Sequence, residues 1–238
     1  MKAYKNPEFM MSYEARTLRV LSEYLEPQAR FRQQAVSKAI IFWGSARIRP
    51  GHRLGMPAVD YYEAARNLSA RLARWTTSKH PEGQRYFVCT GGGPGIMEAV
   101  NRGASEINPS LSIGLGISIP TEQGVNKFIA PLLDFEFHYF FMRKFWFVNL
   151  AHALVIFPGG FGTMDELFEL LTLMQTGKKE RIPVLLFGKR FWDKLIDFEL
   201  LVEHGLIAKE DLGLMHRTDD LDDAFEYLTH EMEPAKPD

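Results

Sequence analysis

Short apolar runs alternate along the chain with longer segments in which apolar residues recur at helical spacing. The short runs predict strands and the longer segments predict helices. The expected strands are residues 39–43, 86–90, 111–117, 133–137, 153–157 and 183–187. The expected helices are residues 59–76, 96–106, 140–151, 163–176, 191–204 and 221–229. Because helices commonly connect the strands of parallel sheets, this alternation predicts an α/β fold with a doubly wound, Rossmann-like parallel sheet flanked by helices.

One further amphipathic segment precedes the first expected strand. Within residues 12–34, Leu18, Leu21 and Leu25 recur at helical spacing among charged residues. This spacing predicts a helix packed on the sheet or on a partner subunit. We therefore divide the chain into an N-terminal helical extension, 1–36, and a single Rossmann-like domain, 37–238.

The segment that follows the fifth apolar run has an unusual composition. It reads PGGFGTMDE, residues 158–166, and leads directly into a helical pattern. Gly159, Gly160 and Gly162 are able to take positive φ and to let a ligand approach the backbone, while the helix start offers free N–H groups. In open parallel sheets ligands bind beyond the carboxyl ends of the strands. We therefore expect a phosphate cradle here that includes Thr163.

Glu166 in the same segment has two interpretations. Thr163 and Glu166 have the spacing of a capping box, in which each side chain binds the other's backbone N–H. Alternatively, Glu166 faces the bound ligand as a hydrogen-bond acceptor or a base. The spacing alone leaves both interpretations open.

A second glycine-rich loop follows the second expected strand. It reads GGGPG, begins with Gly91, Gly92 and Gly93, and is followed by Glu98 on the next helix. Four glycines cost unfolded-chain entropy, which predicts a ligand that needs bare backbone, with a tight turn as the alternative. The run matches neither GxGxxG nor GxxxxGK[ST]. Nicotinamide dinucleotides and the usual nucleoside triphosphatase arrangement are therefore disfavoured.

Polar side chains follow two further strands. Ser45 and Arg47 come directly after the first strand, in a motif that by itself favours a plain turn. Arg143 and Lys144 lie near the start of a helix, where positive charge is disfavoured unless an anion or a carboxylate compensates it. That placement predicts functional cations.

Overall charge and composition narrow the ligand class. A net charge of -2 and a pI near 6.4 argue against a general nucleic-acid binder, so the expected phosphate belongs to a small ligand. No apolar run reaches the roughly 18 residues that a membrane span needs, and the first residues lack a signal-peptide core. We therefore expect no membrane association and a cytoplasmic protein. Cys89, the single cysteine, excludes an internal disulfide and a cysteine-based metal cage.

Taken together, these motifs resemble the LOG family of nucleoside 5′-monophosphate phosphoribohydrolases, which activate cytokinins and are often named lysine decarboxylases. The resemblance covers about residues 39–187. It rests on Gly44-Ser45, GGGPGIMEA, Met142-Arg143-Lys144 and PGGFGTMDE, of which the last matches the family pattern PGGxGTxxE. GGGPGIMEA and the additional N-terminal helix are similar to the longer bacterial branch of the family.

The resemblance implies hydrolysis of the N-glycosidic bond of AMP or an N6-modified AMP, without a metal or a cofactor, giving free base and ribose 5-phosphate. Arg143 and Glu166 match the catalytic positions. The nucleotide-binding residues that it implies are Ser45, Gly91, Gly92, Gly93, Glu98, Met142, Lys144, Gly159, Gly160, Gly162 and Thr163. It also implies a homodimer or a larger homo-oligomer with the site near the subunit boundary.

Two other classes of protein fit the same loops. One is a non-catalytic nucleotide-binding protein or molybdenum-cofactor carrier of the same fold. The other is a sugar-phosphate or nucleotide transferase, whose turnover would require a second acceptor substrate. The presence of both Arg143 and Glu166 favours the hydrolase over the carrier.

Overall fold

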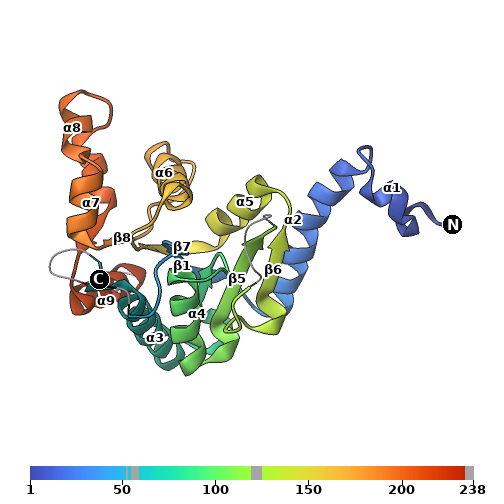
Figure 1. The fold of residues 1–238 in the computed structure, drawn as a ribbon, viewed down its shortest axis with the longest axis horizontal. Helices are drawn as coiled ribbons and strands as arrows, with labels where there is room; N and C mark the ends of the chain where they lie inside the picture. Colours follow the sequence, from blue (N-terminus) through green and yellow to red (C-terminus); the bar gives the residue numbers. More distant parts are fainter. Residues whose placement is uncertain (52, 55–58, 119–124, 234–238) are drawn as a thin grey trace, which may run out of the picture.

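The computed structural model describes residues 1–51, 53–54, 59–118 and 125–233 (Figure 1). Its main sheet has seven strands in the order β6-β5-β4-β1-β7-β8-β9, and all neighbouring strands are parallel. The strands are β1 (Lys38–Trp43), β4 (Tyr86–Thr90), β5 (Ser112–Ile117), β6 (Asp134–Phe137), β7 (Ala151–Ile156), β8 (Val184–Phe187) and β9 (His216–Thr218). A separate two-stranded ribbon pairs β2 (Arg53–Leu54) with β3 (Val59–Asp60). The predicted doubly wound parallel sheet is confirmed.

Helices cover both faces of the sheet. The helices are α1 (Pro7–Met11), α2 (Arg16–Gln33), α3 (Tyr61–Lys79), α4 (Ile96–Ile107), α5 (Phe140–Leu150), α6 (Phe161–Gln175), α7 (Lys189–Leu195), α8 (Phe198–Glu203) and α9 (Leu221–Met232). Helices α3, α4 and α9 pack together on one face, and α2 packs on α5 on the other (Figure 1). Helix α6 lies between α5 and the α7–α8 pair (Figure 1) and packs on the core through Leu167 and Leu170.

Near-continuous burial explains why the strands read as unbroken apolar runs. Ala39, Ile40, Ile41 and Phe42 on β1 are fully buried, and β4 is buried along its whole length. Central strands of a parallel sheet are covered by helices on both faces, so neither set of alternating side chains meets water. The edge strand β9 lacks this burial and is only three residues long. Its sequence therefore carried no apolar run, and the strand was not predicted.

Two predicted helices differ from the structure because of capping. The helix expected over residues 191–204 is two helices, since Asp197 accepts a hydrogen bond from the N–H of Leu200 and starts α8 as a new helix. The helix expected from residue 59 begins at Tyr61. There Asp60 is the N-cap and accepts from the N–H of Glu63.

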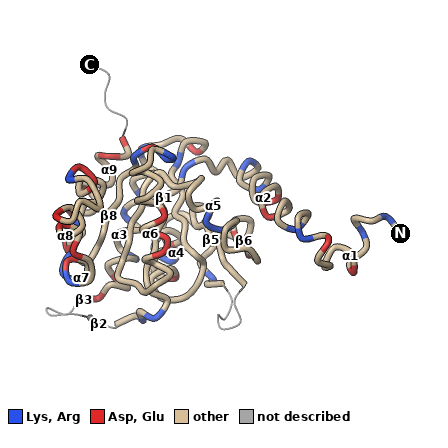
Figure 2. Tube along the Cα trace, turned by 90° about the horizontal axis from the view of Figure 1, so that it is seen from above, with Lys and Arg blue, Asp and Glu red and all other residues tan. Residues whose placement is uncertain are grey.

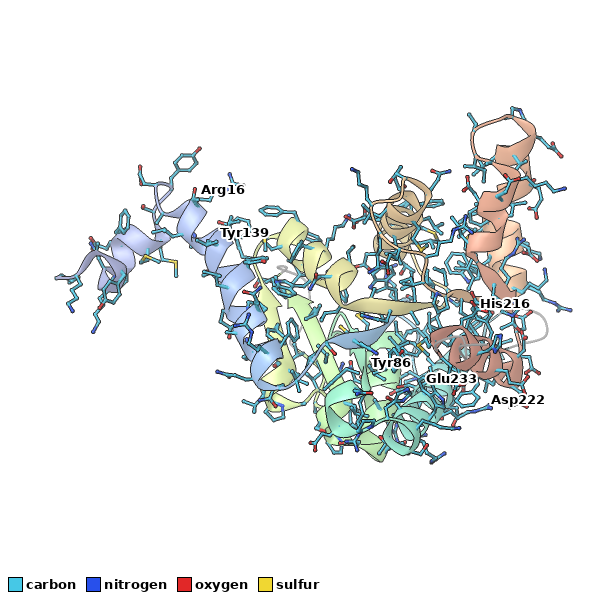
Figure 3. All side chains as sticks on the ribbon, turned by 180° about the vertical axis from the view of Figure 1, so that it is seen from behind. Arg16, Tyr86, Tyr139, His216, Asp222 and Glu233 are labelled. Carbon is cyan, nitrogen blue, oxygen red and sulfur yellow. The ribbon has the colours of Figure 1, made fainter. Side chains whose placement is uncertain are left out.

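The N-terminal extension is helical and its second half is packed on the domain. The Trp146 indole N–H on α5 donates to the Glu23 carbonyl on α2 over 3.0 Å. The Glu23 carboxylate accepts from the backbone N–H groups of His138 and Tyr139 at the start of α5. Arg16 stacks over the Tyr139 ring, 5.7 Å from its centre (Figure 3). Helix α1 and the start of α2 project from the body of the domain (Figure 1).

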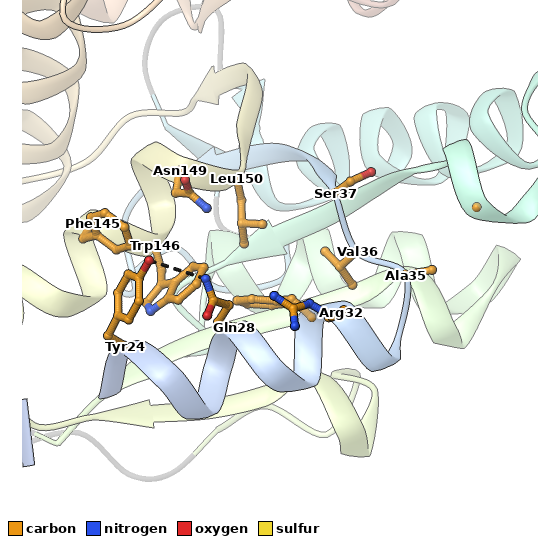
Figure 4. A pocket seen from close by; sticks show the side chains of 12 residues that line it. Tyr24, Gln28, Arg32, Ala35, Val36, Ser37, Phe145, Trp146, Asn149 and Leu150 are labelled. Atoms are coloured by element: carbon orange, nitrogen blue, oxygen red, sulfur yellow. Dashed lines mark hydrogen bonds between the residues drawn. The ribbon is translucent and has the colours of Figure 1, made fainter. Parts of the chain in front are cut away.

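A hollow of about 480 Å³ is lined by residues of α2 and α5, which touch beside it (Figure 4). Tyr24 and Gln28 line it from α2, and Phe145 and Trp146 line it from α5. Because Ser37, directly before β1, also lines it, the hollow lies at the amino end of the sheet.

None of the helices in the described part of the chain is long and apolar enough to cross a membrane.

Candidate functional site

The strand order changes direction at β1, which has β4 on one side and β7 on the other. The loops that follow these three strands are held together by backbone hydrogen bonds. The N–H of Ser45 donates to the Pro158 carbonyl over 3.0 Å, and the Ser45 carbonyl accepts from the N–H of Ile96 over 3.1 Å. Such a switch point at the carboxyl edge of an open sheet is where ligands bind in this architecture.

A cleft of about 980 Å³ opens at this switch point. Most of the residues that the sequence predicts for the site line it: Ser45, Gly91, Arg143, Gly159, Gly160, Gly162, Thr163 and Glu166. Arg47 also lines the cleft, from the loop in which the Ser45 hydroxyl accepts the N–H of Arg47. The three loops thus contribute to one cavity, as expected.

The predicted phosphate cradle lies at the start of α6. This helix begins at Phe161 with Gly160 as its N-cap, and no side chain caps it. The N–H groups of its first turn therefore lack intrahelical partners at the positive end of the helix dipole. Gly159 is needed for space, because a Cβ there would overlap the Thr163 side chain. Gly159, Gly160 and Gly162 do not use their freedom to take positive φ. A Cβ on Gly160 or Gly162 would meet no atom of the described chain, so their contact with a ligand stays a prediction.

Glu166 does not take part in a capping box. Thr163 lies inside α6 rather than at its N-cap, so the capping interpretation of this pair was wrong. Glu166 Oε1 instead lies 3.9 Å from Arg143 Nη2, and the two side chains are only 14% and 13% exposed. Among the described residues, none donates a hydrogen bond to the Glu166 side chain. Its carboxylate is thus left available to a ligand in the cleft.

Burial dominates the electrostatics of Glu166. Desolvation raises the pKa of its carboxyl from 4.5 to about 7, even though the charge of Arg143 acts to lower it. Asp165, the next residue on α6, raises it further, and Lys144 lowers it. A carboxyl group with a pKa near neutrality is suited to exchange a proton at physiological pH.

Arg143 is fixed by the elements around it. Its Nε donates to the Leu115 carbonyl on β5 over 2.8 Å, and its guanidinium lies over the Phe147 ring. Gly91 provides the space for it, because a Cβ on Gly91 would lie 2.5 Å from Arg143 Nη2. Nη2 is thereby directed toward Glu166.

Packing within the chain explains most of the GGGPG loop. Gly92 and Gly95 have φ values of 77° and 72°, and a Cβ on Gly95 would overlap the Ser45 carbonyl. The Asn126 side chain donates to the carbonyls of Gly92 and Gly93. Of the loop's glycines, Gly91 lines the cleft. The tight-turn alternative therefore accounts for Gly92 and Gly95, and the predicted ligand contacts of Gly92 and Gly93 stay predictions.

A buried polar network that the sequence reasoning missed supports this loop. Asn101 is fully buried on α4 and accepts from the Thr90 hydroxyl and the Asn126 amide. It also donates to the Ser112 hydroxyl and the Ile113 carbonyl. An asparagine within an otherwise apolar helix face was the available signal, since a buried amide requires partners.

Three other predicted site residues lie outside the cleft lining. Lys144 Nζ lies 2.7 Å from Asp165 Oδ2 and 3.3 Å from Glu169 Oε2. Met142 is buried in the core, and Glu98 accepts a hydrogen bond from the buried Tyr62 hydroxyl over 3.0 Å. Their nucleotide-binding roles stay predictions.

Apolar side chains form a further part of the cleft lining, the apolar wall. It comprises Phe140, Phe161, Met164, Phe168, Phe191, Leu195 and Ile196. Helix α7 contributes Phe191 and Leu195, and Ile196 is its C-cap, although nothing in this part of the sequence indicated a site. The lining of the cleft therefore combines polar groups with apolar side chains.

The protein is a Rossmann-like α/β protein, because its sheet is parallel and its cleft opens at the switch point of that sheet. An open helix start and a buried Arg–Glu pair lie in the cleft. More particularly, residues 97–228 match the model of the family described as "possible lysine decarboxylase", and the chain belongs to this family, the LOG family.

Two curated relatives support this assignment over part of the chain. A pyrimidine/purine nucleotide 5′-monophosphate nucleosidase from Escherichia coli (strain K12) is 36% identical over 115 residues, which cover 43% of this chain and 24% of the relative. The cytokinin riboside 5′-monophosphate phosphoribohydrolase LOG from Oryza sativa subsp. japonica is 35% identical over 69 residues, which cover 29% of this chain and 28% of the relative. The alignments thus span about a quarter of each relative's length.

Solved structures share the fold at low sequence identity. The X-ray structure of TM1055 aligns with a TM-score of 0.52 and 18% identity over 81% of this chain and 99% of that chain. The molybdenum cofactor binding protein from Rippkaea orientalis aligns with a TM-score of 0.50 and 16% identity over 81% of this chain and 96% of that chain. These similarities show the architecture alone.

Proposed function

We propose that this protein hydrolyses the N-glycosidic bond of a nucleoside 5′-monophosphate, giving the free base and ribose 5-phosphate. The observation that carries the proposal is the Arg143–Glu166 pair in the cleft, one turn from the open start of α6. The names of the curated relatives support the same reaction class.

The 5′-phosphate fits the start of α6, where unpaired N–H groups and the helix dipole favour an anion. Gly159, Gly160 and Gly162 leave the backbone accessible to it. Binding energy from this end holds the anomeric carbon in place for reaction. The apolar wall, with Phe168 and Phe191, provides a surface for the base.

Glu166 in its ionised form accepts a proton from the attacking water and stabilises the oxocarbenium-like charge at the anomeric carbon. The water oxygen forms a bond to that carbon as the carbon–nitrogen bond breaks. The base leaves with the bonding electrons and takes up a proton. Arg143 orients Glu166 and favours its ionised form.

Decarboxylation through a lysine Schiff base has no support in this cleft. No lysine lines the cleft among the residues described. Lys144 is the lysine adjacent to Arg143, and although partial burial lowers its pKa, Asp165 and Glu169 raise the pKa overall. A Schiff base requires an unprotonated amine, which this pairing disfavours.

The finer predictions belong to the same proposal. Substrates are AMP or an N6-modified AMP of the cytokinin riboside type, and the apolar wall accommodates an apolar substituent on the base. The chain forms a homodimer, which is supported by the exposed apolar residues Leu18, Leu21 and Leu25 on α2 and Phe141 and Phe145 on α5.

Incubation of the purified protein with a panel of nucleoside monophosphates, with detection of ribose 5-phosphate, tests the function. We expect release from AMP, and a loss of at least about 100-fold in Glu166→Gln with nucleotide binding retained. Glu26→Gln, an exposed carboxylate on α2, is the matched control and keeps full activity. Full activity in Glu166→Gln would remove Glu166 from the mechanism. Tight nucleotide or pterin binding without product would indicate a carrier instead.

A further inference from the structure

Three ionic contacts connect α5 to α6, and they differ in length. Arg143 Nη2 and Glu166 Oε1 are 3.9 Å apart, which is too long for a hydrogen bond. Lys144 Nζ lies 2.7 Å from Asp165 Oδ2 and 3.3 Å from Glu169 Oε2. The neighbouring cations on α5 therefore act differently, with one loosely and one tightly paired.

The tight contact involves both residues of an i,i+4 pair on α6. Asp165 and Glu169 lie one turn apart, so their carboxylates are neighbours on the helix surface. Lys144 reaches both from α5 and is only 22% exposed. Figure 2 shows the acidic residues of α6 in red. Leu167, Leu170 and Met174 pack α6 on the core, and the Lys144 bridge adds a direct polar contact between the first turns of α6 and α5.

We propose that Lys144 is a positioning residue. Its bridge to Asp165 and Glu169 holds α6 at the distance from α5 at which Glu166 faces Arg143 without a hydrogen bond. The inference rests on the proposed function of the cleft and is an alternative to the nucleotide contact that the family resemblance implies for Lys144. A shorter separation would engage the Glu166 oxygens with Arg143, and a longer one would remove Arg143 from Glu166.

The bridge also balances charge around Glu166. The groups that face this carboxyl are Arg143 and Lys144 from α5, and Asp165 and Glu169 from α6. The Cys89 thiol on β4 is near enough to be influenced by Glu166, but burial raises its pKa and keeps it neutral. Burial is the largest influence on the pKa of Glu166 and raises it. Of the neighbouring charges, the two cations lower this pKa and the two carboxylates raise it. Removing Lys144 therefore raises the pKa of Glu166, whereas neutralising both carboxylates lowers it.

Lys144→Met tests the positioning role, since it keeps the length of the side chain and removes its charge. We expect the acid limb of the kcat–pH profile to move to higher pH by about 1 unit or less. We also expect kcat at neutral pH to fall several-fold and KM for AMP to change by less than about threefold. Lys144→Arg restores part of the loss because it keeps the charge. A KM increase of about tenfold or more with an unmoved acid limb would show that Lys144 binds the nucleotide and would overturn the proposal.

Asp165→Asn combined with Glu169→Gln provides a second variant, which removes negative charge near Glu166 where Lys144→Met removes positive charge. This variant breaks the same bridge from α6, so kcat at neutral pH is expected to fall in it as well, although the loss of two negative charges acts to lower the pKa of Glu166. An unchanged kcat in this variant would contradict the positioning role. Lys189→Met, which removes an ion pair with Asp193 on α7, is the matched control and leaves the profile unchanged.

A readout independent of turnover separates this inference from the proposed function. The Glu166 carboxyl is titrated by NMR in protein labelled with ¹³C-glutamate, and its signal is assigned by its loss in Glu166→Gln. If the wild type releases no ribose 5-phosphate, the proposed function fails. The Lys144 inference then still requires the Glu166 titration to move upward in Lys144→Met, and an unmoved titration would overturn it.

Discussion

Replacement of Glu166 by glutamine should make the protein more stable while making it inactive. Burial raises the pKa of the Glu166 carboxyl from 4.5 to about 7 in the folded protein. Below pH 4.5 the group is protonated in both the folded and the unfolded chain, and it costs nothing. Between pH 4.5 and 7 the unfolded chain ionises first, which favours unfolding, and above pH 7 the cost is fully present.

The size of the effect follows from the pKa. A rise from 4.5 to about 7, at 1.36 kcal/mol per pH unit, corresponds to about 3 kcal/mol at pH 8.5. At pH 5 the same linkage leaves about 1 kcal/mol. Glutamine has nearly the same shape and no charge, so it removes this cost. The attraction of Arg143 for the ionised carboxylate is already contained in the pKa of about 7, so it does not reduce this difference further.

Urea unfolding of the wild type and Glu166→Gln at pH 5 and pH 8.5 measures the difference. We expect the free energy of unfolding of the variant to exceed that of the wild type, and the excess to be larger at pH 8.5 by about 2 kcal/mol. Glu26→Gln, an exposed carboxylate paired with Arg30, should change stability by less than about 0.5 kcal/mol at both pH values. An excess that is absent, or equal at the two pH values, would refute the claim that Glu166 is held in a desolvated site.

Three further substitutions test the structure around the cleft. Gly159→Ala should lower the melting temperature and weaken AMP binding about tenfold or more, because the added Cβ overlaps Thr163. Gly162→Ala is the control: its Cβ meets open space, so the melting temperature should stay unchanged or rise. If both alanines behave alike in thermal melts, the close packing at Gly159 is not what requires glycine. Asn101→Leu should reduce the free energy of unfolding by about 2 kcal/mol or more, since it leaves buried partners unsatisfied, and chemical denaturation with an unchanged midpoint would contradict this.

Local chemistry made much of the fold predictable. The apolar runs of β1 and β4 indicated strands because parallel central strands are buried on both faces. Asp60 and Asp197 altered the helix boundaries by capping, and capping is also a local signal, although it was not recognised at these positions. Strand β9 gave no such signal, because a short edge strand needs neither length nor an apolar pattern.

The sequence by itself determined the parallel α/β architecture, the glycine loops after the strands and the open helix start at PGGFGT, because strand burial, glycine and helix ends act within a few residues. Only the tertiary structure decided which charges meet. It paired Arg143 with Glu166 rather than leaving Glu166 in a capping box, and it turned Lys144 toward Asp165 and Glu169. The physical reason is that these contacts depend on how the strand order places α5 beside α6. Spacing along the chain does not specify that placement.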